Sequence, residues 1–235
     1  MTTKQPSHAT PPAGPPSGPT WLHGIWHLFG LLLWDLVFRV LNRVTVIGRE
    51  HIPPRGATNV LICANHISAL DPFLIGSVAM PRFSPVWWRA PAKEELFAHP
   101  IMRALLDSWG AFPVRRGQRD FASMERMMRL LDTSVIVIFP EGRWSKTGEL
   151  LPGRPGVGRI IHTAKPTVIP VAMVGTDHIV PRDSTLPRLG RRATIVFGPP
   201  MKLESFYDQP DTLELSQQIA DEVMKAIGDL YRTIR

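Results

Sequence analysis

Short apolar runs that end in turn-forming residues predict the buried strands of this chain. They cover residues 44–47, 60–64, 85–90, 134–139, 167–174 and 194–197. Several are apolar without alternation, which is typical of strands covered on both faces. Glycine and proline follow most of these runs and predict tight turns at their ends.

Segments with helical spacing lie between these runs. Residues 73–80, 101–109, 120–131, 157–164 and 213–234 predict helices, and residues 93–97 predict the start of another. Strands that alternate with helices predict an α/β fold with a mostly parallel central sheet flanked by helices. With 235 residues and 44% hydrophobic content, the chain can form one such domain, assigned to residues 44–235.

The N-terminal region has a different character. Residues 1–20 are rich in Pro, Ser, Thr and Gly and predict a disordered tail. Residues 21–43 place apolar side chains and several tryptophans on one arc of a helix, and Arg39, Arg43 and Arg49 follow. The uninterrupted apolar run is shorter than a bilayer requires, so we expect an amphipathic helix lying on a membrane surface. The alternative is a helix packed on the protein's own core.

Composition narrows the class of partner. The net charge is +7 and the sequence pI is 10.2, which favours nucleic acid, a phosphorylated substrate or an anionic membrane. The sequence contains no long basic tract and no zinc-finger or aromatic RNA-binding signature, so nucleic acid is not expected. The single cysteine, Cys63, lies in an apolar run and predicts a core residue in a reducing compartment. No cleavable signal peptide is evident.

The first candidate for chemistry is His66, directly after the apolar run 60–64. Asp71 and Pro72 follow and predict the N-cap and first residue of a helix. The short separation allows the Asp71 carboxylate to orient the imidazole as a general base. Two alternatives stay open on these residues alone: a capped helix start with an unrelated histidine, and a pair of metal ligands that lacks a visible third.

Two further polar segments follow apolar runs. They are Arg115-Arg116, and Glu141-Gly142-Arg143. Loops at the carboxyl edge of a parallel sheet share one face, so we expect these residues to lie near His66. A base beside guanidinium groups suits a substrate with a hydroxyl to activate and a phosphate to hold. Taken alone, the arginine pair is more typical of a solvated surface.

The chain resembles the glycerophospholipid acyltransferases in four ordered blocks. Residues 65–72, NHISALDP, resemble the family's HxxxxD motif, and residues 110–117 resemble its second block. Residues 139–142, FPEG, resemble the third block and residues 168–171 the fourth. The basic residue Arg154 and the glycine two positions later match a basic-x-Gly element before the next helix.

This resemblance implies an O-acyltransferase that moves a fatty acyl group from acyl-CoA or acyl carrier protein to a lysophospholipid. The acceptor is expected to be 1-acyl-sn-glycerol-3-phosphate, which gives phosphatidic acid. His66 would be the base and Asp71 would orient it, with no cofactor beyond the acyl donor and no metal. The resemblance assigns the acceptor phosphate to Arg116, with Arg115 nearby, and the shape of the acceptor site to Glu141 and Gly142.

One departure concerns the third block, where the family usually continues Thr-Arg-Ser. Here the residues are Arg143-Trp144-Ser145, so a tryptophan stands where an arginine is expected. Two alternatives follow: Arg143 reaches the same phosphate from a shifted backbone, or the acceptor has another head group, such as that of an ornithine lipid. A thioesterase or lysolipid hydrolase and a lipid-binding module without catalysis are rivals from other classes. The expected location is the cytoplasmic face of a membrane, as a peripheral or monotopic protein.

Overall fold

The computed structural model describes residues 18–115, 120–181 and 186–235. The predicted tail therefore lies almost entirely outside the described residues. A six-stranded sheet forms the centre of the molecule, with strand order β1-β8-β7-β2-β6-β3. The strands are β1 (Arg43–Ile47), β2 (Val60–Ala64), β3 (Trp87–Arg89), β6 (Ser134–Ile138), β7 (Thr167–Val174) and β8 (Arg192–Phe197).

Four of the five strand pairs in this sheet are parallel, and only β7 and β8 run antiparallel. The predicted α/β fold with a mostly parallel sheet is therefore confirmed. The central strands β2 and β6 are buried at every position, which explains their unbroken apolar sequences. Their side chains alternate between two cores, one on each face of the sheet.

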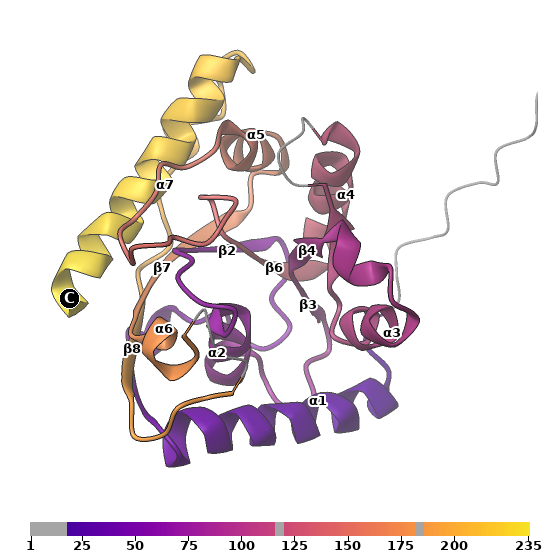
Figure 1. The fold of residues 1–235 in the computed structure, drawn as a ribbon. Helices are drawn as coiled ribbons and strands as arrows, with labels where there is room; N and C mark the ends of the chain where they lie inside the picture. Colours follow the sequence, from indigo (N-terminus) through magenta and orange to yellow (C-terminus); the bar gives the residue numbers. More distant parts are fainter. Residues whose placement is uncertain (1–17, 116–119, 182–185) are drawn as a thin grey trace, which may run out of the picture.

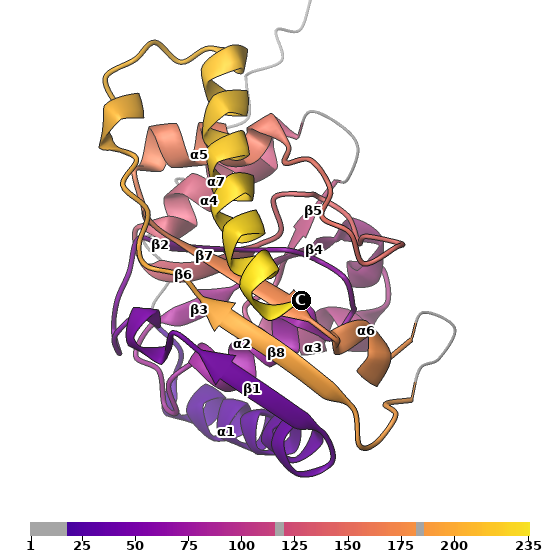
Figure 2. The same ribbon diagram turned by 90° about the vertical axis from the view of Figure 1, so that its left-hand side faces the viewer.

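Helices cover both faces (Figures 1 and 2). One face carries α1 (Trp21–Asp35), α2 (Asp71–Ala79) and the short α6 (Thr176–Ile179), which the sequence pattern did not predict. The other face carries α4 (Phe121–Leu131), α5 (Pro155–Ala164) and the long α7 (Leu213–Ile234). Single-turn 3₁₀ helices occur at Arg49–His51, Glu94–Phe97 and Glu204–Phe206.

A small second sheet replaces part of the expected pattern, whereas the helix predicted over residues 101–109 is present as α3. β4 (Pro91–Lys93) pairs with β5 (Phe112–Val114), and α3 covers Pro100–Ser108. The predicted strand 85–90 is thus shorter, and the chain enters a second strand at Pro91. The helix predicted from residue 93 is only a 3₁₀ turn, because β4 continues through Lys93.

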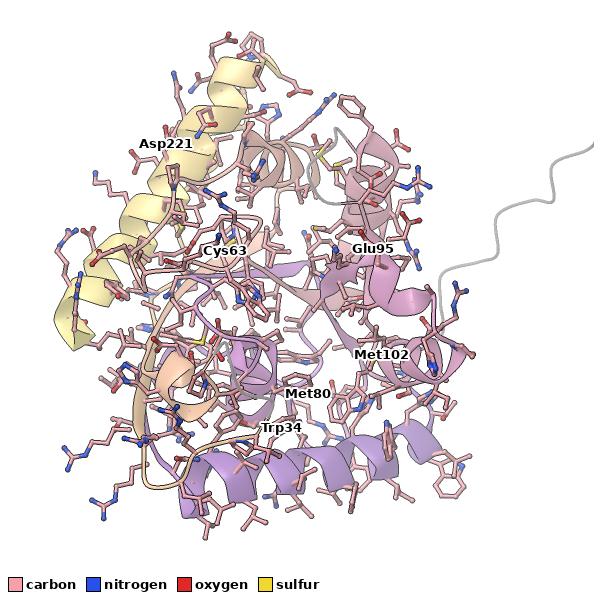
Figure 3. The ribbon with its side chains drawn as sticks, viewed as in Figure 1. Trp34, Cys63, Met80, Glu95, Met102 and Asp221 are labelled. Atoms are coloured by element: carbon pink, nitrogen blue, oxygen red, sulfur yellow. The ribbon has the colours of Figure 1, made fainter. Side chains whose placement is uncertain are left out.

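Helix α1 continues as a π-helix through Leu36–Val40 and lies along one side of the body (Figure 1). Its contact with the body uses small, polar and apolar positions, since Gly24, His27, Gly30 and Leu31 are buried. Trp34 points from α1 toward α2, where its ring stacks on Phe73 at 4.5 Å (Figure 3).

The apolar arc of this helix faces outward instead. Its exposed members are Trp21, Leu22, Ile25, Trp26, Phe29, Leu32, Leu33, Leu36 and Val40. The 20 residues Trp21–Val40 are long and apolar enough to cross a membrane by length and composition. The predicted helix is confirmed, and its other side packs on the protein's own core through Leu31, Trp34 and Val37.

Candidate active site

A histidine–aspartate pair occupies the loop that joins β2 to α2. His66 Nδ1 lies 2.8 Å from Asp71 Oδ2, and both side chains are buried. Because the carboxylate accepts the proton on Nδ1, Nε2 is the basic nitrogen of the neutral ring. The structure therefore brings together the two residues that the sequence paired, in the arrangement of a general base.

Asp71 does not cap α2 as the sequence predicted. Leu70 is the N-cap residue, and Asp71 begins the helix. Its carboxylate turns back toward the loop, where Oδ2 accepts the N–H groups of Ile67 (2.7 Å) and Ser68 (2.8 Å). Oδ1 accepts the hydroxyl of Thr176 at 2.6 Å. The imidazole and these three donors use the carboxylate's lone pairs, which favours an orienting role over metal ligation.

Neighbouring strands fix the loop that carries His66. The Asn65 amide donates to the Met173 carbonyl (2.9 Å) and accepts the Met173 N–H (2.7 Å), which ties the loop to β7. The carbonyl of His66 accepts the N–H of Ser145 at 2.7 Å. The imidazole is therefore held by its backbone on two sides as well as by Asp71, so its orientation is preorganised.

Aromatic rings enclose the imidazole. Phe139 stacks on it with ring centroids 3.9 Å apart and an interplanar angle of 13°. Trp144 meets it edge-on at 5.6 Å and is itself 37% exposed. His66 is only 4% exposed. A buried, aromatic surrounding strengthens the interaction between the ring and its carboxylate.

Glu141 joins the same loop from the turn after β6. Its Oε1 accepts the N–H of His66 at 3.3 Å, and Oε2 has no hydrogen-bond partner among the described residues. Burial raises the pKa of Glu141 to about 7, and the nearby Asp71 charge adds to the rise. Glu141 therefore supports the His66 loop and carries a proton over part of the neutral pH range.

His66 opens onto a cavity of about 630 Å³. Its walls come from β6 and from helices α4, α5 and α7 and are mostly apolar. The lining residues include Phe121, Met124, Met127, Ile138, Val157 and Ile160. Arg115, Gly142, Arg154 and Arg159 also line it, so guanidinium groups lie beside an apolar chamber and the imidazole.

The predicted arginines lie on different segments of the chain. Arg115 follows β5, so it comes from the small sheet and not from the carboxyl edge of the main sheet. Its Nε donates to Glu94 at 2.9 Å, and this bond and the Glu94 charge raise the pKa of Arg115. Arg116 lies outside the described residues. Arg143 is exposed and lines a smaller hollow of about 230 Å³ with Glu141 and Arg154.

Gly142 acts through its backbone. Its φ is +68°, and an added Cβ would lie 2.8 Å from Arg154 Nε. That nitrogen donates to the carbonyl of Glu141 at 3.3 Å. Glycine is therefore required where the turn after β6 packs against the guanidinium at the start of α5.

Several residues that shape the site had no contact assigned to them from the sequence, although Asn65 and Phe139 belong to the quoted blocks and Trp144 was noted as a departure. Thr176, Phe139 and Trp144 contact Asp71 or the imidazole, and Asn65 anchors the loop. A polar Asn directly after a buried strand was a usable signal for the anchor. No local pattern marks Thr176, because it lies in a helix of four residues, 105 positions from Asp71.

A sequence profile described as Acyltransferase matches residues 43–174, more than half of the chain. The chain belongs to the acyltransferase family. It is 23% identical over 210 residues to the 1-acyl-sn-glycerol-3-phosphate acyltransferase of Limnanthes douglasii, covering 87% of this chain and 68% of that protein. The enzyme of the same name from Borreliella burgdorferi is 30% identical over 142 residues, which cover 58% of this chain and 53% of that protein.

A Cocos nucifera 1-acyl-sn-glycerol-3-phosphate acyltransferase is 27% identical over 195 residues, covering 78% of this chain and 56% of that protein. The chain thus spans between about half and two thirds of the length of these relatives. The crystal structure of the 1-acyl-sn-glycerophosphate (LPA) acyltransferase PlsC from Thermotoga maritima superimposes with a TM-score of 0.64 at 22% identity. That match covers 89% of this chain and 80% of PlsC and establishes a shared fold. Family membership makes this chain an acyltransferase.

Proposed function

We propose that this acyltransferase transfers a fatty acyl group from a thioester to the free hydroxyl of 1-acyl-sn-glycerol-3-phosphate and forms phosphatidic acid. One observation carries the proposal. The buried His66–Asp71 pair, with Nδ1 and Oδ2 2.8 Å apart, opens onto an apolar cavity that guanidinium groups also line. A base, an apolar chamber and cations are the groups that a lysophosphatidic acid acceptor and an acyl thioester require.

In this mechanism the acceptor hydroxyl donates its proton to Nε2 of His66 as its oxygen attacks the thioester carbon. Asp71 stabilises the imidazolium that forms and keeps its orientation. The tetrahedral intermediate collapses with cleavage of the carbon–sulfur bond, and the proton on Nε2 passes to the departing sulfur. The products are an ester and a free thiol, and the histidine returns to its neutral form without a covalent enzyme intermediate.

The cavity supplies the proposed binding sites. Its apolar walls on α4 and α5 suit a fatty acyl chain, because burial of each methylene contributes about 0.8 kcal/mol. Arg115 and Arg154 stand at the polar part of the lining, where a bidentate fork can hold a phosphate. Arg116 and Arg143 remain proposed phosphate ligands, and Glu141 and Gly142 are proposed to shape the acceptor site.

The exposed apolar face of α1 is proposed to lie in the membrane interface on its cytoplasmic side. Leu22, Phe29 and Leu33 are among its exposed side chains. A helix with apolar and tryptophan side chains outward binds a bilayer surface through that face. Binding through this face would keep the enzyme on the membrane that contains its lipid acceptor, with the donor in the cytosol.

The test uses purified protein with mixed micelles of lysophosphatidic acid and either acyl-CoA or acyl carrier protein, read by mass spectrometry. We expect phosphatidic acid from at least one donor and none from a His66→Ala variant that keeps its melting temperature. Free fatty acid formed at the same rate without acceptor would mean a hydrolase. Full transfer by His66→Ala would contradict the proposal.

A second acceptor class follows from Trp144. Its ring lies edge-on to His66 at 5.6 Å. The family that the sequence resembles usually has an arginine at this position. An acceptor whose head group is not a phosphate monoester would not need that arginine. The assay should therefore include lysolipids with ornithine, choline and glycerol head groups, and a faster rate with one of these would reassign the acceptor.

A further inference from the structure

The start of β8 lies beside the C-terminal end of the N-terminal helix, although about 150 residues separate them in sequence (Figures 1 and 2). Buried Asn42 joins the two segments. Its amide donates to the Val37 carbonyl at 2.9 Å, and its Oδ1 accepts the N–H of Arg191 at 2.9 Å. The Leu41 carbonyl also accepts the N–H of Gly190 at 2.8 Å. This junction sets the loop before β8 at a fixed place relative to the helix.

Four arginines gather at this junction: Arg43, Arg188, Arg191 and Arg192. All four are exposed. Arg43 and Arg192 are direct partners in the β1–β8 register, and the N–H of Arg43 donates to the Arg191 carbonyl at 2.8 Å. We call this set the arginine edge.

The arginine edge carries net positive charge. Within residues 18–115, 120–181 and 186–235, none of its guanidinium groups forms an ion pair with a carboxylate. The nearby Asp35 already pairs with Arg39 at 2.9 Å. Four like charges on adjacent backbone segments repel one another, so this arrangement favours an anionic partner.

Exposed aliphatic side chains accompany these charges. Val40 is 73% exposed at the end of the helix, and Leu189 is 63% exposed within the arginine-bearing loop. Val40 ends the exposed apolar arc that runs along α1, and Leu189 is next to Gly190, whose N–H donates to the Leu41 carbonyl. Apolar side chains flanked by cations are typical of a surface that meets the acyl and phosphate layers of a bilayer together.

We infer that the arginine edge is a docking surface for anionic phospholipid head groups and forms, with the apolar face of α1, one continuous membrane-binding surface. The inference rests on the proposed membrane role of α1. The helix alone would hold the enzyme through apolar contacts that do not distinguish lipid head groups. The arginine edge adds charge at one end of the helix only, so it gives selectivity for anionic lipid and a fixed orientation on the surface.

The matched pair of variants is Arg191→Glu/Arg192→Glu and Lys202→Glu/Lys225→Glu. Both make the same charge change, and the lysines are exposed beyond the opposite end of β8 and on α7. Binding is measured by co-sedimentation with phosphatidylcholine vesicles, with and without phosphatidylglycerol, at low and high salt. Each cation near an anionic membrane changes affinity about fivefold, so we expect a loss of 10-fold or more for the arginine variant on anionic vesicles.

The same variant should bind neutral vesicles as the wild type does and keep full acyl transfer in detergent micelles. The lysine control should stay within about threefold of the wild type on both vesicle types, since its charges are remote from the surface. High salt should remove the difference between anionic and neutral vesicles. Addition of inorganic phosphate at constant ionic strength should not release the protein.

Several outcomes would overturn the inference. They are an unchanged affinity of the arginine variant for anionic vesicles, an equal loss by the lysine control, and an equal loss on neutral vesicles. Release by inorganic phosphate would mean a phosphate site instead of a bilayer surface. A Leu32→Glu variant separates the two proposals, because it should weaken binding to both vesicle types if α1 enters the interface. Wild-type protein that binds neither vesicle would overturn both.

Discussion

The Asp71 oxygen that lies 2.8 Å from His66 Nδ1 also accepts the N–H groups of Ile67 and Ser68. One carboxylate therefore orients the imidazole and closes the loop that carries it. The other oxygen is fixed by the Thr176 hydroxyl at 2.6 Å. Geometry of the base and conformation of the loop are coupled through a single side chain.

Replacement of this carboxylate by an amide tests how far the catalytic rate depends on its charge. Asp71→Asn keeps the size of the side chain but cannot accept from all of its present donors. We expect kcat to fall on the order of 10³- to 10⁴-fold, because the imidazole loses its preferred tautomer and the stabilisation of its charged form. Steady-state kinetics at saturating substrate measure this loss.

Thr176→Val is the matched variant, since it removes only the donor to Oδ1. It should cost on the order of 1.5–3 kcal/mol of folding stability and change kcat far less than Asp71→Asn does. A Thr176→Val variant as inactive as Asp71→Asn would contradict the assignment of imidazole orientation to Oδ2 and of folding stability to the bond at Oδ1.

Glu141 predicts a pH dependence of stability. Its pKa is raised from 4.5 to about 7 by burial, so the native state binds the proton more tightly than the unfolded state. The resulting stabilisation is fully present below pH 4.5 and is lost as pH rises through 7. Relative to Glu141→Gln, the wild type should lose on the order of 2–3 kcal/mol across this window. Denaturant unfolding at a series of pH values measures the difference, and parallel curves for the two proteins would refute it.

Much of the fold follows from local sequence patterns because buried strands and long amphipathic helices carry strong periodic signals. The strands 60–64 and 134–138 and the helix 213–234 agree with prediction within a residue or two. Residues 112–114 were predicted as a short extended piece, but β4 and its pairing with β5 were missed because each strand has only three residues, too few for a period to show.

The site was predictable to the extent that its residues are close in sequence. His66 and Asp71 are five positions apart, and one loop holds both. The predicted bond between Asp71 and His66 is present, and only the N-cap role of Asp71 was wrong, because the competing donors Ile67 and Thr176 become visible only when the loop and α6 are placed together. The arginine edge could not be predicted for the same reason, because it combines residues that are about 150 positions apart in the sequence.

Trp144 predicts acceptor selectivity. It stands edge-on to the imidazole at 5.6 Å and is partly exposed, so an arginine there could reach an acceptor phosphate. Trp144→Arg should lower KM for lysophosphatidic acid about 10-fold, the effect of one charge-assisted hydrogen bond, with little change for a neutral lysolipid. Trp144→Leu controls for loss of the ring. An equal gain for neutral and phosphorylated acceptors would exclude the electrostatic explanation.

The contact between α5 and α7 requires a glycine. A Cβ on Gly158 would lie 1.8 Å from the Ser216 carbonyl oxygen, and backbone cannot move aside as a flexible side chain can. Gly158→Ala should therefore destabilise the protein by about 3 kcal/mol or more and lower its melting temperature. Gly76→Ala in α2 is the control, because nothing lies within 4 Å of the added Cβ and alanine favours the helix by about 1 kcal/mol. Equal melting temperatures for the two variants would contradict this account.

The cavity predicts which acyl chains the enzyme accepts. Met127 of α4 lines it and is 6% exposed, whereas Met128 packs in the same core without lining the cavity. Met127→Trp places a larger side chain in the cavity. The kcat/KM for a palmitoyl donor should therefore fall 10-fold or more, while the kcat/KM for a decanoyl donor changes less than threefold. Met128→Trp should change both donors alike, since any effect there acts through general packing. Competition between the two donors, resolved by mass spectrometry of the product, measures the ratio directly. A uniform loss over chain lengths for Met127→Trp would mean that the acyl chain binds elsewhere.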